Sequence, residues 1–91
     1  MKIHELKSWP APFEAIDTGS KRHEFRRDDR GFEQGDLLLL REWLPEAREY
    51  KGHYTGREQL LEVTRIEYEP LWGIPEGYVI LTVRPVSVVP A

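Results

Sequence analysis

The chain has 91 residues and a formal net charge of −3, with 40% hydrophobic and 32% charged residues. Such a length suits one domain with a small core, which we expect to bury about 60 to 65% of the surface exposed by the unfolded chain. The acidic balance argues against a protein that coats duplex nucleic acid through many phosphate contacts. Because the chain has no cysteine, disulfides, thiolate nucleophiles and cysteine-ligated zinc are excluded.

The first ten residues, MKIHELKSWP, are charged and lack the apolar centre of a signal peptide. No apolar run approaches the 18 residues that suggest a membrane-spanning helix. We therefore expect a cytoplasmic protein that is not bound to a membrane.

The first elements follow from hydrophobic spacing and from proline and glycine. Residues 2–7 alternate and predict a short strand. Pro12 suits a first helical turn, Phe13 and Ile16 share one helical face, and Gly19 suits a left-handed cap. The sequence therefore predicts one helix of about two turns that ends before Gly19.

A period of two begins after this helix. His23, Phe25 and Arg27 fall on one side of a predicted strand, and Arg22, Glu24 and Arg26 fall on the other. The rest of the chain predicts a loop at 28–36, a central strand at 37–43 and an exposed ribbon or loop at 44–58. Two further strands follow at 59–69 and 78–89, separated by a break rich in proline and glycine.

Five or six closely spaced strands and one early helix predict a mainly β fold: a small, mixed or antiparallel pseudo-barrel that is closed or half-closed. Antiparallel pairing is favoured because parallel pairs need crossover helices, and the pattern offers only one helix. Since the core is small, we expect at least two of the three tryptophans to be buried.

The segment GSKRHEFRRDD, residues 19–29, gathers five basic side chains in an otherwise acidic chain. Glu24 and Arg26 are two apart on the predicted strand, so their Cα atoms lie roughly 6.5 to 7 Å apart on one face. With Lys21 they offer an ammonium, a planar guanidinium and a carboxylate. This set suits a nucleotide better than a bare phosphate, because the cations can contact phosphate oxygens while the carboxylate accepts from an amine of the base. Alternatively, these side chains form exposed ion pairs with neighbouring charges at the rim of the barrel and bind no ligand.

Other residues extend this candidate site. Arg22, Arg27 and Arg30 could lengthen a basic lip along a strand of RNA, although residues 27–30 also suit a solvated turn. Exposed aromatic rings could stack on bases, and the candidates with an exposed setting are Tyr50, Tyr54 and Trp72.

The three histidines, His4, His23 and His53, lie on separate segments without the spacing of metal ligands. We therefore expect neither a metal ion nor another cofactor. His4 either lines the pocket or hydrogen-bonds within the first strand, and the sequence does not decide between the two.

Gly19, Lys21, Glu24 and Arg26 reproduce the GxKxxExR signature of the ASCH domains, a branch of the PUA-like barrel superfamily. The flanking segments resemble a narrower group, the DUF3850 proteins of bacteria and phages, over HELK at 4–7, residues 13–36 and YTGRE at 54–58. This resemblance implies a PUA-like pseudo-barrel with the motif at the mouth of a cleft beside the helix. It also implies binding of RNA or of modified nucleosides.

Three functions remain open. The first is a monomeric module that binds RNA or a nucleotide through Lys21, Glu24 and Arg26. The second is a small amidohydrolase of acylated nucleosides, in which Lys21 acts as base or nucleophile and Glu24 orients it. The ASCH branch with that activity has threonine in place of Glu24, which weakens the transfer. The third is a protein-interaction module that uses an exposed ribbon at residues 45–58.

Overall fold

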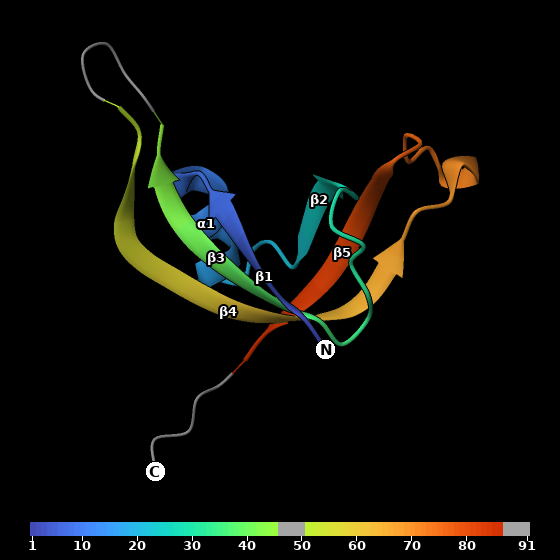
Figure 1. The fold of residues 1–91 in the computed structure, drawn as a ribbon, viewed down its shortest axis with the longest axis horizontal. Helices are drawn as coiled ribbons and strands as arrows, with labels where there is room; N and C mark the ends of the chain where they lie inside the picture. The colour runs from blue at the N-terminus through green and yellow to red at the C-terminus, as the bar shows by residue number, and fades with distance from the viewer. Residues whose placement is uncertain (46–50, 87–91) are drawn as a thin grey trace.

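The computed structural model describes residues 1–45 and 51–86. Within these residues the chain forms five strands, one α-helix and one short 3-10 helix (Figure 1). In chain order they are β1 (Ile3–Ser8), α1 (Pro10–Asp17), β2 (His23–Arg27), β3 (Leu37–Leu44), β4 (His53–Glu67), η1 (Pro70–Trp72) and β5 (Tyr78–Pro85). The predicted mainly β fold with one short helix is confirmed.

The five strands form one mixed sheet in the order β1-β3-β4-β5-β2. The long strand β4 curves beneath both arms of the sheet, which gives a half-barrel with β1 and β2 at its two ends (Figure 1). β1 pairs with β3 in parallel, and the other neighbouring strands pair in an antiparallel manner. The expectation that the chain has no crossover connection for a parallel pair was wrong, because the segment with α1 and β2 connects β1 to β3 and is long enough for parallel pairing.

The core lies on the concave side of the sheet. Side chains alternate between the two faces of each strand, so every second one points into this core. β1 buries residues 4, 6 and 8, and β3 buries residues 38, 40 and 42. Leucines and valines of the strands pack there against Phe13 and Ile16 of α1. This alternation decides which polar residues also reach the interior.

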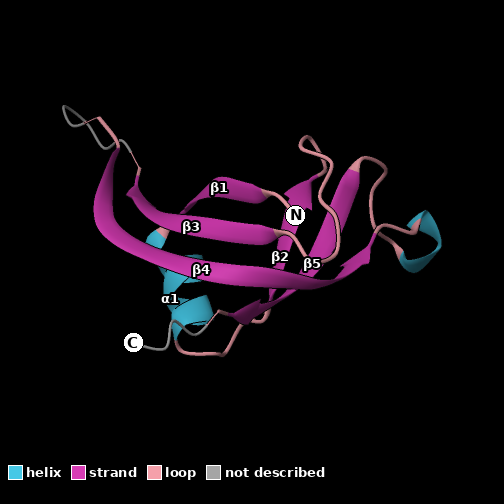
Figure 2. Ribbon diagram, turned by 60° about the horizontal axis from the view of Figure 1, so that its bottom comes forward, coloured by secondary structure: helices cyan, strands magenta, loops and turns pink. Residues whose placement is uncertain are grey.

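Helix α1 packs against one end of the sheet (Figure 2). It begins at Pro10, so Pro12 lies in its first turn as predicted, and Phe13 and Ile16 are its buried residues. Gly19 follows the helix with φ of 83°, as predicted for a left-handed cap, and its N–H donates to the Ile16 carbonyl at 3.1 Å. None of the helices in the described ranges is long and apolar enough to cross a membrane.

Of the exposed ribbon or loop predicted at 44–58, residues 53–58 are an exposed ribbon. They already belong to β4, which is 15 residues long and starts at His53, so the strand predicted at 59–69 begins earlier than expected. This segment pairs with the end of β3, where Trp43 lies opposite Tyr54. Residues 46–50, including Tyr50, lie outside the described part of the chain, as do residues 87–89 of the predicted last strand.

The expectation of two buried tryptophans is also wrong. Trp9 and Trp72 are 61% and 60% exposed, and Trp43 is half-buried. Aliphatic side chains of the strands and the ring of Phe13 fill the interior instead, so the tryptophans remain at the surface.

Candidate functional site

Strand β2 forms one end of the sheet and divides its charged residues between two faces. Glu24 points to the interior and is only 4% exposed, and Arg26 on the same face is half-buried. His23, Phe25 and Arg27 are exposed on the opposite face. The predicted alternation is confirmed, so the basic residues of β2 do not all face the same side of the sheet.

The side-chain heads of Lys21, Glu24 and Arg26 converge. Arg26 donates from Nε to Glu24 Oε2 at 3.1 Å, and Lys21 Nζ lies 3.6 Å from Glu24 Oε1. The turn after α1 places Lys21, whose backbone N–H donates to the Ala15 carbonyl at 3.0 Å. One carboxylate therefore lies between an ammonium and a guanidinium.

One oxygen of this carboxylate is incompletely satisfied. Glu24 Oε1 is buried and has no hydrogen-bond partner among the described residues, because the ammonium of Lys21 is slightly too far to donate. Such an atom in a native fold requires an explanation, and a ligand donor is one.

Arg26 also connects the two end strands of the half-barrel. Its Nη2 donates to the Lys7 carbonyl of β1 at 2.9 Å, while its Nε is held by Glu24. β1 and β2 share no strand pairing, so this side chain bridges the seam between them.

Two further buried polar side chains, Ser8 and Glu42, lie near this end of the interior. They are register partners on β1 and β3, and Ser8 directly follows Lys7, whose carbonyl Arg26 contacts. Ser8 Oγ, like Glu24 Oε1, has no hydrogen-bond partner among the described residues. Neither residue was predicted as part of the site, although alternation along β3 places Glu42 on one face with Leu38 and Leu40.

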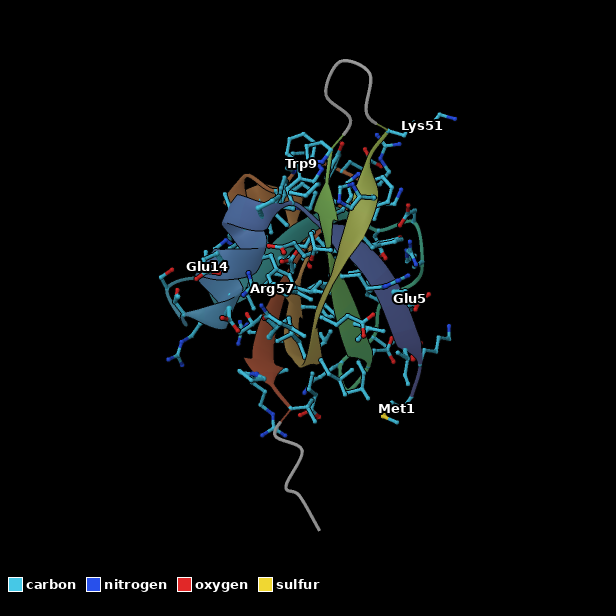
Figure 3. All side chains as sticks on the ribbon, turned by 90° about the vertical axis from the view of Figure 1, so that its left-hand side faces the viewer. Met1, Glu5, Trp9, Glu14, Lys51 and Arg57 are labelled. Atoms are coloured by element: carbon cyan, nitrogen blue, oxygen red, sulfur yellow. The ribbon has the colours of Figure 1, made fainter. Side chains whose placement is uncertain are left out.

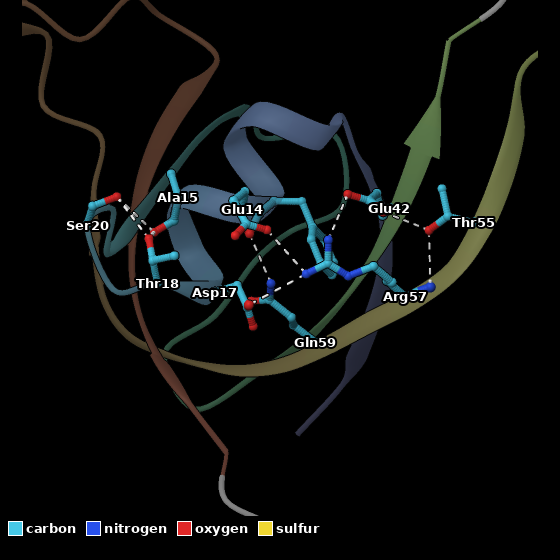
Figure 4. A network of polar contacts seen from close by, with 10 residues as sticks. Glu14, Ala15, Asp17, Thr18, Ser20, Glu42, Thr55, Arg57 and Gln59 are labelled. Carbon is cyan, nitrogen blue, oxygen red and sulfur yellow. Dashed lines mark hydrogen bonds and ion pairs between the residues drawn. The ribbon is translucent and has the colours of Figure 1, made fainter.

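Glu42 and Arg57 belong to a polar network between α1 and β4 (Figure 4). Glu42 accepts from Thr55 Oγ1 at 2.8 Å and lies 3.5 Å from Arg57 Nη1. Arg57 Nη2 also lies 3.2 Å from Glu14 Oε2 and 3.5 Å from Asp17 Oδ2, both on the helix. Figure 3 shows Arg57 next to the helix that carries Glu14. This arginine therefore holds α1 over the same end of the interior.

The other predicted arginines lie outside the cluster of Lys21, Glu24 and Arg26. Arg22 is exposed and, with Lys21, lines a hollow of about 110 Å³. Arg27 points to the outer face, where its Nη2 lies 3.4 Å from the Tyr78 hydroxyl. Arg30 is exposed in the following loop, with its Nε 3.8 Å from Asp29 Oδ1. A second hollow of about 300 Å³ lies between Arg26, Arg27 and Arg30.

His4 lies away from these arginines, in contact with Asp36 and Phe32. His4 Nε2 and Asp36 Oδ2 are 2.9 Å apart, and the imidazole meets the Phe32 ring edge-on at 4.8 Å between centroids. Burial raises the pKa of Asp36, but hydrogen bonds from His4 and from the backbone N–H groups of Lys2 and Glu33 outweigh it and lower the pKa to about 2. In the described ranges, no three His, Asp or Glu side chains gather as possible metal ligands.

The family of the chain follows from its similarity to known proteins. Residues 3–83 match the model of a family described as "Domain of unknown function (DUF3850)". The chain is also 39% identical over 80 residues to the "Uncharacterized 12.9 kDa protein in GpA 3'region" of Escherichia phage P2. That alignment covers 88% of this chain and 66% of the phage protein, so the chain spans just under two thirds of its relative. The resemblance to this group is confirmed, and the chain belongs to the DUF3850 family.

Proposed function

We propose that this protein binds a nucleotide, free or as part of RNA, through Lys21, Glu24 and Arg26. The observation that carries the proposal is the buried Glu24 carboxylate, whose Oε1 has no hydrogen-bond partner among the described residues while two cations flank it. An N–H group of a nucleobase would supply the missing donor. The flanking cations would contact phosphate oxygens.

The exposures of the three side chains support this division of labour. The Lys21 and Arg26 side chains keep about a quarter of their surface accessible, whereas Glu24 is almost fully covered. A bare phosphate site would not place a buried carboxylate between its two cations, because like charges repel. A ligand that combines donors with negative charge satisfies both kinds of group.

We further propose that this DUF3850 protein belongs to the ASCH branch of the PUA-like superfamily. The half-barrel of five strands, the short helix before β2 and the position of the motif between them all support this assignment. The binding of RNA or modified nucleosides that the branch implies is consistent with the convergent side chains.

Titration by NMR with nucleosides, mononucleotides and short single-stranded RNAs tests the proposal. We expect chemical-shift changes around Lys21, Glu24 and Arg26 with at least one nucleotide. Lys21→Met and Glu24→Gln should weaken that binding about tenfold or more, because each removes a charge that contacts the ligand. Lys2→Met is the matched control, since Lys2 is an exposed lysine at the opposite end of β1.

Affinity for a single-stranded RNA should also fall with salt. If two or three phosphates are contacted, the slope of log affinity against log salt should be about −1.5 to −2. Absence of binding to every nucleotide and RNA tested, or equal losses in Lys2→Met and Lys21→Met, contradicts the proposal.

The contact between Lys21 and Glu24 favours a second candidate, a hydrolase of acylated nucleosides. The 3.6 Å separation leaves Glu24 Oε1 free to orient a water molecule beside the lysine. Incubation with acylated cytidine at high protein concentration should then release acid, and Lys21→Ala should abolish the release. No release by the unaltered protein excludes this candidate.

A further inference from the structure

The 300 Å³ hollow lies along the seam between the two end strands of the half-barrel. It is lined by Leu6 of β1 and by residues 25–27 of β2, and the loop residues Asp29 and Arg30 complete it. Since β1 and β2 do not pair with each other, no strand pairing closes this side of the sheet in the described part of the chain, and Arg26 bridges it to the Lys7 carbonyl. Arg26 therefore belongs both to this hollow and to the cluster that it forms with Glu24 and Lys21.

An aromatic pair borders this hollow on the outer face. The rings of Phe25 and Tyr78 stack with centroids 5.3 Å apart and an interplanar angle of 16°. Tyr78 covers one side of the Phe25 ring, yet Phe25 remains 50% exposed and lines the hollow. Phe25 therefore presents a large apolar ring at the edge of a polar hollow, where a planar group could stack on it.

The charge around this ring is positive. Arg26, Arg27 and Arg30 line the hollow against one acidic residue, Asp29. The Arg27 guanidinium lies 5.7 Å from the centroid of the Tyr78 ring, which leaves it beside the stacked pair. Arginines next to exposed aromatic rings are the combination by which proteins hold the backbone and bases of single-stranded nucleic acid.

We infer that the free edge of β2 along this hollow is a second binding site, at which a single-stranded nucleic acid stacks a base on Phe25 and places phosphates on Arg27 and Arg30. The inference rests on the proposed function, and it specifies the ligand of that function as a strand that continues beyond the nucleotide at Glu24. Arg26 joins the two sites, because it contacts Glu24 through Nε and also lines the hollow.

Single-stranded nucleic acid fits these observations better than two other anionic partners. A duplex keeps its bases stacked on one another, so it could use the arginines but not the Phe25 ring. An acidic peptide could also meet the arginines, but it has no planar ring system of its own to cover Phe25. The test therefore includes both as competing outcomes.

The experiment measures affinity for three probes: a mononucleotide, a twelve-nucleotide RNA of mixed sequence, and the same RNA annealed to its complement. We expect Phe25→Leu to weaken binding of the single strand about tenfold, because a stacked base is lost, and to leave mononucleotide binding unchanged. Tyr54→Leu is the matched control, because Tyr54 is also an exposed ring that packs against another aromatic side chain and lies under an arginine.

The arginines have a separate readout. Arg27→Gln combined with Arg30→Gln should reduce the slope of log affinity against log salt by about 1.4, since each phosphate contact on a single strand contributes about 0.7. The double variant Arg65→Gln, Arg84→Gln removes the same charge from exposed positions outside the hollow and should leave the slope unchanged.

The outcomes separate this inference from the proposed function. If the mononucleotide binds in a Lys21-dependent manner but Phe25→Leu behaves like Tyr54→Leu, the second site is wrong and the first stands. If the single strand depends on Phe25 but Lys21→Met leaves mononucleotide binding intact, the first site is wrong. Equal affinity for the duplex, or equal competition by an acidic peptide of the same charge, overturns the second site as a nucleic-acid surface.

Discussion

Arg26 Nη2 donates a hydrogen bond to the Lys7 carbonyl at 2.9 Å and thereby joins β2 to β1, the two ends of an otherwise open sheet. The same guanidinium holds the Glu24 carboxylate through Nε. A single side chain therefore stabilises the half-barrel and forms part of the candidate site.

Arg26→Ala should lower the free energy of unfolding by about 1 to 3 kcal/mol, because it removes two charge-assisted hydrogen bonds and leaves buried Glu24 with one cation. Urea unfolding followed by circular dichroism measures the change. Arg27→Ala is the control, since this neighbouring arginine points to the outer face, where it contacts Tyr78 and not Glu24 or β1. Equal losses in the two variants would show that the seam contact does not stabilise the fold.

Asp36 should make the protein sensitive to acid. Its pKa falls from 3.8 to about 2 on folding, so its contribution is present above pH 4 and is lost as the pH falls toward 2. A difference of this size corresponds to about 2 kcal/mol. Unfolding free energies measured between pH 6 and pH 2 should decline less steeply in Asp36→Asn, although that variant is less stable at pH 6. Asp29→Asn, at an exposed position, should retain the full decline.

Arg57 should control how firmly α1 is held. Arg57→Ala removes its contacts with Glu14, Asp17 and Glu42, and about half of the Arg57 side chain is exposed, so the expected loss of stability is only about 1 kcal/mol. The sharper readout is hydrogen exchange, which should accelerate in the amides of α1 more than in those of β5. Arg65→Ala, whose guanidinium contacts Glu67, should not change exchange in the helix.

Gly52 should not tolerate a side chain while Trp43 is present. A methyl group at Gly52 would overlap the indole ring of Trp43, so we expect Gly52→Ala to cost about 1 to 3 kcal/mol of stability through overpacking. In a Trp43→Leu background the same change should cost much less, because the indole is absent. A cost that is the same in both backgrounds, measured by urea unfolding, would contradict the predicted clash.

Much of the architecture could be predicted from local patterns. Alternation located β1, β2 and β3 to within one or two residues, and Pro12, Phe13, Ile16 and Gly19 indicated α1. The start of β4 was missed because its first residues are polar and contain glycine. They become a strand by pairing with the end of β3, and no local signal reports such pairing.

The candidate site could likewise be predicted only in part from local patterns. Alternation along β2 by itself determined that Glu24 and Arg26 share one face while Phe25 and Arg27 share the other, because the side-chain period of a strand is two. The sequence could not show that Arg26 reaches the Lys7 carbonyl, since these residues are far apart in the chain. Only the curvature of the sheet, which brings β1 and β2 toward one another, decided that. Burial is a property of the folded chain, so only the tertiary structure places Glu24 Oε1 in the interior without a hydrogen-bond partner among the described residues.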